Sequence, residues 1–185
     1  MGLAAGSKAL SRRRFIALAA PAVVCATSLS GVVQAAVPRD RRLKLYSIHT
    51  GEKLTSVYFA DGEYQQAGLA EIYHILRDWR TDEVHAMDTG LLDFLHDLHV
   101  RMDGSGPFHI ISGYRSPKTN AKLRDKSKGV AKKSLHMRGM ASDVALPDRD
   151  LKQLRETALA MKRGGVGYYA KSGFIHVDTG RVRFW

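Results

Sequence analysis

Two short segments constrain the fold of this chain most, because apolar and polar side chains alternate in each. Residues 174–178 read FIHVD, and residues 141–146 read ASDVAL. Successive side chains of a β-strand point to opposite faces, so each segment predicts a strand with one apolar face and one face that carries polar groups. A sheet with a single apolar face needs a second layer to cover it.

The rest of the sequence supplies further strands and the helices that can form this layer. Alternation predicts strands over 43–48, 54–60 and 108–111. Apolar residues at helical spacing predict helices over 69–79, 91–102 and 151–161. The pair Ser116-Pro117, a hydroxyl cap followed by proline, predicts a fourth helix that runs to Arg124. Because there is no repeat and no second domain, we predict a single α+β domain, an antiparallel sheet with flanking helices.

Residues 1–36 differ from the rest of the chain and contain no acidic side chain. The arginines Arg12, Arg13 and Arg14 precede an apolar, alanine-rich run that ends in small residues, a pattern typical of a cleavable secretory signal. The paired arginines before Phe15 resemble a twin-arginine signal, which exports folded proteins. We therefore predict a signal peptide over 1–35 and a mature domain over 36–185.

Two other interpretations of this segment stay open. The apolar run is close to the length of a membrane anchor, although Pro21 interrupts it, and the valines before Cys25 disfavour lipid attachment there.

Cleavage would leave no cysteine, which suits an oxidising compartment, and no stable membrane span. We predict a periplasmic protein. Its basic excess, 29 Lys and Arg against 18 Asp and Glu in the full chain, then favours peptidoglycan or a membrane surface as partner, not nucleic acid.

The polar faces of the two initial segments carry a candidate metal site. His136 precedes Asp143 by seven positions, and Gly139 between them lets the chain turn. If the two strands pair, Asp143 and His176 can converge with His136. Two imidazoles and one carboxylate suit zinc, Zn²⁺, with the fourth position open to water. The alternative is that each histidine is only a structural residue.

Five motifs lie along the mature chain: Ser112-Gly113-Tyr114-Arg115-Ser116, the Ser134 to Asp143 stretch, Gly164-Gly165-Val166-Gly167-Tyr168-Tyr169, His176-x-Asp178 and the ending Gly180 to Trp185. Together they resemble the D-Ala-D-Ala metallopeptidase group, which shares its fold with hedgehog signalling domains, and within it the YcbK-like periplasmic murein endopeptidases. The resemblance covers nearly the whole mature chain. It implies one zinc ion per chain held by His136, Asp143 and His176, and hydrolysis of peptide bonds in peptidoglycan.

The resemblance also suggests catalytic residues. Arg115 matches an arginine placed near the substrate carbonyl or carboxylate, and its alternative role is a structural salt bridge. Some relatives carry an acidic residue three positions before the last histidine ligand, where this chain has Gly173. Asp178 is therefore the candidate general base, and its alternative role is to orient a ligand.

The remaining candidates are weaker. His96 and His99 lie three apart on a predicted helix without a third ligand, and His109 is expected to be structural. Tyr168 and Tyr169 either line a substrate cleft or pack under the last strand.

The predicted function is a zinc-dependent peptidoglycan hydrolase, a murein endopeptidase. The alternatives are a non-catalytic, zinc-containing peptidoglycan-binding module and a polyanion-binding export factor. The sequence does not specify which peptidoglycan bond is cleaved.

Overall fold

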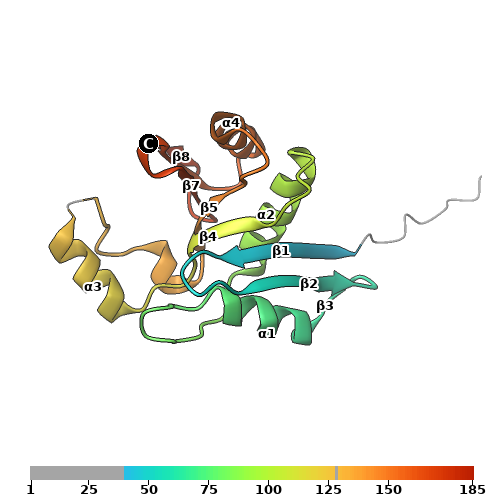
Figure 1. The fold of residues 1–185 in the computed structure, drawn as a ribbon, viewed down its shortest axis with the longest axis horizontal. Coiled ribbons are helices and arrows are strands. Elements are labelled where there is room, and N and C mark those ends of the chain that lie inside the picture. Colours follow the sequence, from blue (N-terminus) through green and yellow to red (C-terminus); the bar gives the residue numbers. More distant parts are fainter. Residues whose placement is uncertain (1–39, 128) are drawn as a thin grey trace, which may run out of the picture. The chain divides into compact units, whose positions relative to one another are not determined.

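One mixed β-sheet forms the centre of the described chain. The computed structural model describes residues 40–127 and 129–185, so the predicted signal segment lies outside the described residues. The strands are β1 (Arg41–Ser47), β2 (Lys53–Ala60), β3 (Glu63–Tyr64), β4 (Phe108–Ser112), β5 (Ala141–Ala145), β6 (Gly165–Tyr169), β7 (Phe174–Asp178) and β8 (Arg183–Phe184). They lie in the order β3-β2-β1-β4-β5-β7-β6-β8 (Figure 1).

Three helices cover the apolar face of this sheet. Helix α1 (Gln66–Ile75) packs against β2, α2 (Thr89–Arg101) against β1, and α4 (Leu151–Met161) against β6 and β7. Apolar side chains of these helices and of the strands form one continuous buried core. In it, Val144, Ile175 and Val177 are fully buried, as the alternation in their strands predicts. Helix α3 (Pro117–Lys126) lies apart from the other helices, at the left of Figure 1.

The α+β class and the flanking helices are confirmed, but the sheet is not purely antiparallel. Five strand pairs are antiparallel, whereas β1 with β4 and β6 with β8 are parallel in the described part of the chain. The β1–β4 pair is parallel because the chain crosses over through α1 and α2 before it returns beside β1. Strand β6 was not predicted, because glycines at 165 and 167 obscure its alternation.

The first predicted helix is shorter than expected. The spacing predicts a helix over 69–79, but α1 ends at Ile75 and Trp79 lies beyond it, exposed and stacked on His49 with ring centroids 4.2 Å apart. The buried Asp78 carboxylate explains the break, because it accepts the backbone N–H groups of Arg80 and Ser116. These bonds fix a turn where the apolar periodicity alone would continue the helix.

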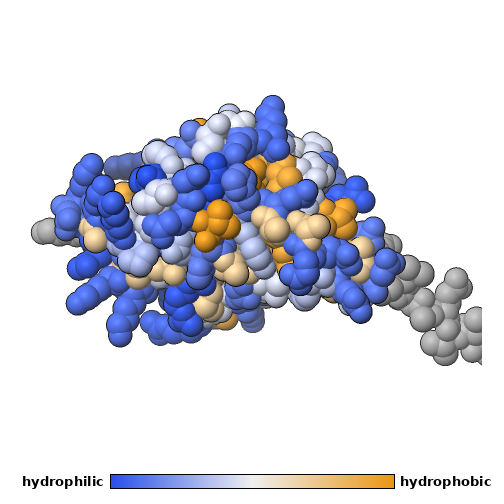
Figure 2. Space-filling model, turned by 90° about the horizontal axis from the view of Figure 1, so that it is seen from below, coloured by the Kyte–Doolittle hydropathy of each residue, from blue (hydrophilic) through white to orange (hydrophobic). Residues whose placement is uncertain are grey.

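The described surface is largely hydrophilic. Figure 2 shows extended hydrophilic side chains at the left of the view, where Figure 1 places α3. Among the described residues of α3 and of the loop after it, the exposed cations are Lys118, Lys122, Arg124, Lys126, Lys132 and Lys133. Of the helices formed by the described residues, none has the length and hydrophobicity that a membrane span needs.

The carboxylate of Asp93 ties α2 to the first strands. It accepts hydrogen bonds from the Tyr58 and Tyr64 hydroxyls, each at 2.9 Å, and pairs with Arg41 at 2.7 Å. Burial raises the pKa of Asp93, but the hydrogen bonds and the charge of Arg41 outweigh burial, so the net shift of this pKa is downward. The folded state therefore favours the ionised carboxylate.

We expect Asp93→Asn to lower the free energy of unfolding by about 1–3 kcal/mol at pH 7, because Arg41 loses its charged partner. The folded-state pKa of Asp93 lies below the unfolded value of 3.8. The stabilisation is therefore present above that pH and is lost as the pH falls through the folded-state pKa. Urea denaturation at pH 7 and at about pH 3 measures both effects. Glu71→Gln, exposed on α1, is the control. An Asp93→Asn penalty that is equal at both pH values would contradict this account.

Candidate metal centre

Three side chains from separate segments meet on the face of the sheet opposite the core. His136 lies in a short 3-10 turn, Leu135–Arg138, while Asp143 projects from β5 and His176 from β7. All three are buried, with His136 exposed by only 3% and the other two by 8%. In the antiparallel pairing of β5 and β7, Asp143 lies directly opposite His176. The predicted metal site required these two strands to pair. They do pair, and the pairing places Asp143 and His176 together beside His136.

The loop that carries His136 is held from both ends. The Ser134 hydroxyl accepts the backbone N–H of His136, as expected of a residue that fixes this loop. Gly139 ends the turn with φ of 66°, in the left-handed region. A side chain there would also meet the Ala86 carbonyl oxygen at 2.3 Å. Gly139 is thus required both for its conformation and for close packing.

The hydrogen bonds of the two histidines define which ring nitrogens face each other. His136 Nδ1 lies 2.8 Å from the Gly113 carbonyl oxygen, and His176 Nε2 lies 2.8 Å from Asp178 Oδ2. Both partners only accept, so these nitrogens carry the protons and donate. In the neutral rings, His136 Nε2 and His176 Nδ1 then present lone pairs. Asp143 Oδ1 adds a third acceptor to the same point.

The spacing of these three acceptors fits a metal ion. His136 Nε2 lies 3.2 Å from His176 Nδ1 and 3.3 Å from Asp143 Oδ1, and the last two atoms are 2.9 Å apart. Ligands about 2.0–2.1 Å from a tetrahedral zinc ion lie roughly 3.4 Å from one another. Acceptors this close repel one another unless a cation or a proton lies between them. Among the described residues, these three form a group that can hold a metal ion.

Asp178 lies behind His176, outside the cleft. Its side chain is fully buried, and Oδ1 accepts the backbone N–H groups of Gly165 at 3.0 Å and Gly180 at 2.8 Å. Arg183 contacts both carboxylate oxygens, at 3.0 and 2.7 Å. Every oxygen of Asp178 is therefore occupied, and the His176 ring separates it from the cleft. This position does not support the expected role as general base and favours the alternative, orientation of a ligand.

The charges at the centre perturb one another. Burial raises the pKa of Asp143, but His136 and His176, through the charge and the hydrogen bonds that they offer when protonated, outweigh burial and hold this pKa below its ordinary value. Burial likewise raises the pKa of Asp178, and the bonds from His176 and Arg183 reverse the shift. For His176 burial lowers the pKa, whereas hydrogen bonds to the two aspartates raise it above its ordinary value. The surroundings thus favour positive charge at this point, as a cation site requires.

Arg115 flanks the cluster on the side of β4. Its Nη2 lies 3.2 Å from Ser112 Oγ and 3.4 Å from Asp143 Oδ2, and its side chain is 11% exposed. Burial lowers the pKa of the guanidinium against the opposing effect of Asp143, but an arginine remains a cation at neutral pH. Its Nε is buried without a hydrogen-bond partner in the described chain. Both side-chain hydrogen bonds of Arg115 use Nη2, so within the described chain Nη1 keeps its hydrogen-bonding capacity.

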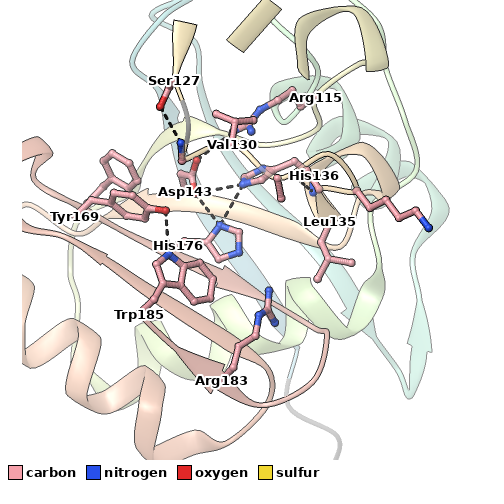
Figure 3. Close-up of a pocket in the computed structure, with 15 residues that line it drawn as sticks. Arg115, Ser127, Val130, Leu135, His136, Asp143, Tyr169, His176, Arg183 and Trp185 are labelled. Carbon is pink, nitrogen blue, oxygen red and sulfur yellow. Dashed lines mark hydrogen bonds and ion pairs between the residues drawn. The ribbon is translucent and has the colours of Figure 1, made fainter. Parts of the chain in front are cut away.

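A cleft of about 480 Å³ opens onto the three ligands, within the range of small-ligand sites. Figure 3 shows the labelled side chains of its walls. One wall is the loop after α3, which includes Ser127, Val130 and Lys133. The other wall is aromatic and consists of Tyr169, Phe174 and Trp185. A basic rim thus faces an aromatic wall across the candidate metal centre.

The other histidines of the sequence analysis lie outside this centre. His96 Nδ1 contacts the Arg42 carbonyl oxygen at 3.1 Å, and His99 Nε2 the Gly106 carbonyl oxygen at 2.7 Å. His109 packs edge-on against Tyr46. Each of the three therefore has a structural contact, in line with the expectation.

Tyr168 and Tyr169 differ in position, and each fits one of the two roles considered for this pair. Tyr168 packs against the core under a cation contact from Arg155, whereas Tyr169 lines the cleft. Sequence reasoning missed the individual roles of Arg183 and Trp185. The only available signal was the C-terminal motif as a whole, because neither residue lies in a segment with a recognisable alternation.

Comparison with known proteins places this chain in a family. The family model described as "Peptidoglycan L,D-endopeptidase MepK", of the Peptidase_M15_2 group, matches residues 35–185. The protein named "Peptidoglycan L,D-endopeptidase MepK" of Escherichia coli K12 is 40% identical over 176 residues, which cover 95% of this chain and 97% of that protein.

A more distant relative agrees with this result. The "Probable peptidoglycan L,D-endopeptidase MepK" of Haemophilus influenzae is 37% identical over 157 residues, which cover 84% of each chain. These matches confirm the resemblance to metallopeptidases inferred from the motifs. The chain belongs to the peptidoglycan L,D-endopeptidase MepK family of metallopeptidases.

Proposed function

We propose that this protein is a zinc-dependent endopeptidase that hydrolyses peptide cross-links in peptidoglycan. The observation that carries the proposal is the convergence of His136 Nε2, Asp143 Oδ1 and His176 Nδ1, each within about 3.3 Å of the others, at the floor of an open cleft. Family membership supports the substrate class, since the relatives are named peptidoglycan L,D-endopeptidases.

In this proposal His136, Asp143 and His176 hold one zinc ion, and the side of the ion that faces the cleft is left for substrate and water. When bound, the ion supplies Lewis-acid chemistry that polarises a carbonyl group and activates water. The overall reaction consumes one water molecule per amide bond and yields a carboxylate and an ammonium group. Two protein ligands are neutral and one is anionic, so the loaded site keeps a positive charge that favours an electron-rich substrate oxygen.

Arg115 contributes a fixed positive charge to the same cleft. Its contact with Asp143 holds the guanidinium in place through Nη2, and Nη1 makes no hydrogen bond within the described chain. We assign to Arg115 the stabilisation of negative charge that develops on the substrate carbonyl oxygen, or the binding of a neighbouring substrate carboxylate. Either task uses the hydrogen bonds and the permanent charge of a guanidinium.

Asp178 acts in this proposal as a positioning residue. Its contact with His176 Nε2 fixes the ring so that Nδ1 faces the other two ligands. Arg183 and two backbone N–H groups keep the Asp178 carboxylate ionised and immobile. The cleft-lining residues include no carboxylate besides Asp143 in the described chain. We therefore do not assign proton transfer during hydrolysis to Asp178.

The name of the relatives narrows the choice of bond. A cross-link between two diaminopimelate residues joins the carbonyl of an L centre to the nitrogen of a D centre. The cross-link from D-Ala to diaminopimelate joins two D centres, and removal of a terminal D-Ala is not an endopeptidase reaction. We therefore propose the diaminopimelate–diaminopimelate bond as the substrate. Lys133, at the edge of the cleft, suits a free carboxylate of such a peptide.

We further propose that the protein is exported and acts in the periplasm. The support is the N-terminal sequence, in which Arg12, Arg13 and Arg14 precede an apolar run as in a twin-arginine signal. The family model matches from residue 35 onward, which agrees with a signal over 1–35 and a mature domain over 36–185.

Removal of any one ligand should abolish both metal binding and cleavage. We expect His136→Ala, Asp143→Ala and His176→Ala each to lower activity by about 10²-fold or more, because two remaining ligands hold zinc weakly. Elemental analysis of the purified variants measures zinc per chain. His74→Ala, at an exposed histidine of α1, serves as the matched control and should keep both zinc and activity. Full activity in one of the three variants would remove that residue from the ligand set.

Digestion of cross-linked peptidoglycan tests the substrate directly. With sacculi that contain both kinds of cross-link, we expect dimers joined by diaminopimelate–diaminopimelate bonds to convert to monomers, while D-Ala-linked dimers remain. A chelator should stop the conversion and added zinc should restore it. Mass analysis of the released muropeptides identifies the bond. Loss of the D-Ala-linked dimers would refute the bond assignment, and no cleavage at full zinc occupancy would favour a binding module.

The role of Asp178 is separable from that of a general base. We expect Asp178→Asn to weaken zinc binding by about 10- to 100-fold, because His176 loses its charged partner, so that excess zinc restores part of the activity. Zinc titration monitored by activity and by metal content measures this effect. The control is Asp150→Asn at the start of α4, because aspartate and asparagine are both good N-cap residues. Lost activity at unchanged zinc affinity would instead identify Asp178 as a proton carrier.

A further inference from the structure

The aromatic wall of the cleft contains the hydroxyl group of Tyr169, which has no role in the proposed function. Tyr169 is the last residue of β6 and pairs with Phe174 across the β6–β7 ladder. The two rings stack with centroids 4.6 Å apart at an interplanar angle of 18°. This cross-strand contact fixes the plane of the tyrosine ring. The hydroxyl at its tip is therefore held by two strands of the sheet and not by a loop.

A second contact fixes the direction in which this hydroxyl can donate. The Trp185 indole donates its N–H to Tyr169 Oη at 3.0 Å. An indole nitrogen cannot accept, so the tyrosine proton must point elsewhere. In the described part of the chain no residue accepts that proton, and the Tyr169 side chain lines the cleft (Figure 3). Tyr169 thus presents a directed hydrogen-bond donor to whatever occupies the cleft.

The position of Trp185 itself is fixed by backbone contacts. Its N–H donates to the Val166 carbonyl at 3.3 Å, and its carbonyl accepts from the Tyr168 N–H at 3.0 Å. The indole lies against Gly167, where a Cβ would come within 2.7 Å of the ring. The same ring stands 5.2 Å, centroid to centroid, from His176. The Tyr169–Trp185 pair therefore adjoins the metal centre.

Arg115 and Tyr169 reach the metal centre from different strands. Arg115 follows β4, Tyr169 ends β6, and both line the cleft. Arg115 provides a charged donor and Tyr169 a neutral one. Two such donors on the walls of one cleft, next to a candidate metal centre, are typical of sites that stabilise an oxyanion.

We propose that Tyr169 is a catalytic residue that donates a hydrogen bond to the oxygen of the scissile carbonyl as this oxygen becomes negative, and that Trp185 is the positioning residue that directs it. This inference rests on the proposed function. Tyr169 keeps its proton throughout, and only a hydrogen bond forms and strengthens. Because the bond strengthens as negative charge develops, its loss should affect turnover more than ground-state binding.

The neighbouring tyrosine supplies a matched control. Tyr168 projects to the other face of β6, packs against the core and lies under Arg155. Tyr169→Phe and Tyr168→Phe each remove one hydroxyl and retain the ring. With a purified, cross-linked muropeptide dimer as substrate, we expect Tyr169→Phe to lower kcat about 10- to 100-fold and to change KM by less than about twofold. Zinc content and Tm should equal those of the wild type. Tyr168→Phe should leave kcat within about twofold of the wild type.

Trp185→Phe tests the positioning role, because phenylalanine keeps an aromatic ring and removes the indole donor. We expect a smaller loss of kcat than in Tyr169→Phe, with KM and zinc content unchanged. The double variant Tyr169→Phe/Trp185→Phe should be no slower than Tyr169→Phe alone, since Trp185 acts through the hydroxyl. Additive losses in the double variant would overturn the positioning role.

A binding measurement separates this proposal from the proposed function. A phosphinate analogue, in which a tetrahedral phosphinate replaces the scissile amide, presents the charged oxygen permanently. It should bind zinc-loaded wild-type protein about 10-fold or more tighter than Tyr169→Phe, whereas the cleaved monomer should bind both equally. If wild-type protein binds the phosphinate but cleaves nothing, the proposed function fails while the contact stands. Unchanged kcat in Tyr169→Phe, a rise in KM alone, or equal phosphinate binding would overturn the role of Tyr169.

Discussion

The antiparallel register between β5 and β7 is the constraint on which the metal centre depends. This register sets Asp143 opposite His176 on one face, and it sends Val144, Ile175 and Val177 into the core on the other. A shift of one residue would exchange the two faces, burying charge in the core and exposing apolar side chains. The free energy of core packing therefore also fixes the distance between two of the three candidate ligands. No separate stabilisation of the site geometry is needed along these strands.

Burial of charge behind the ligands explains the arrangement at the end of the chain. Asp178 is fully buried, and an unpaired carboxylate at such a position would cost several kcal/mol. Arg183 and the backbone N–H groups of Gly165 and Gly180 compensate it. Gly165 lies on β6, whereas Gly180 and Arg183 follow β7, where the chain turns back and adds β8 beside β6. The same turn brings Trp185 to the cleft, so the segment that compensates one buried charge also builds part of the cleft wall.

How far the sequence predicts this structure depends on whether a feature is local. Alternation located β5 and β7 and the faces of Asp143 and His176, because a strand has a fixed side-chain period. His136 lies in a loop without a period; its spacing from Asp143 across Gly139 made it a candidate, and the resemblance supported it. The end of α1 could not be predicted, because it depends on a contact distant in sequence, that of Asp78 with Ser116. Strand β6 was missed because glycines at 165 and 167 obscure its alternation. The role of Asp178 could not be decided from the sequence either. This role depends on the contact with Arg183, which is not visible in the sequence pattern, and on the side of the His176 ring where the carboxylate lies.

The distribution of charge around the cleft assigns different tasks to its parts. At the floor, Asp143 and the two histidines attract a cation, and burial makes that attraction strong by excluding water. On the rim, Lys133 attracts anions but remains solvated, so its contribution is weak and sensitive to salt. A peptide rich in carboxylates can thus be drawn to the rim. In the proposed function, an oxygen that turns from neutral to negative during hydrolysis would be stabilised by the bound ion, by Arg115 and by the Tyr169 hydroxyl. Because this stabilisation grows with the charge on the oxygen, the cleft would favour the transition state of amide hydrolysis over the neutral substrate.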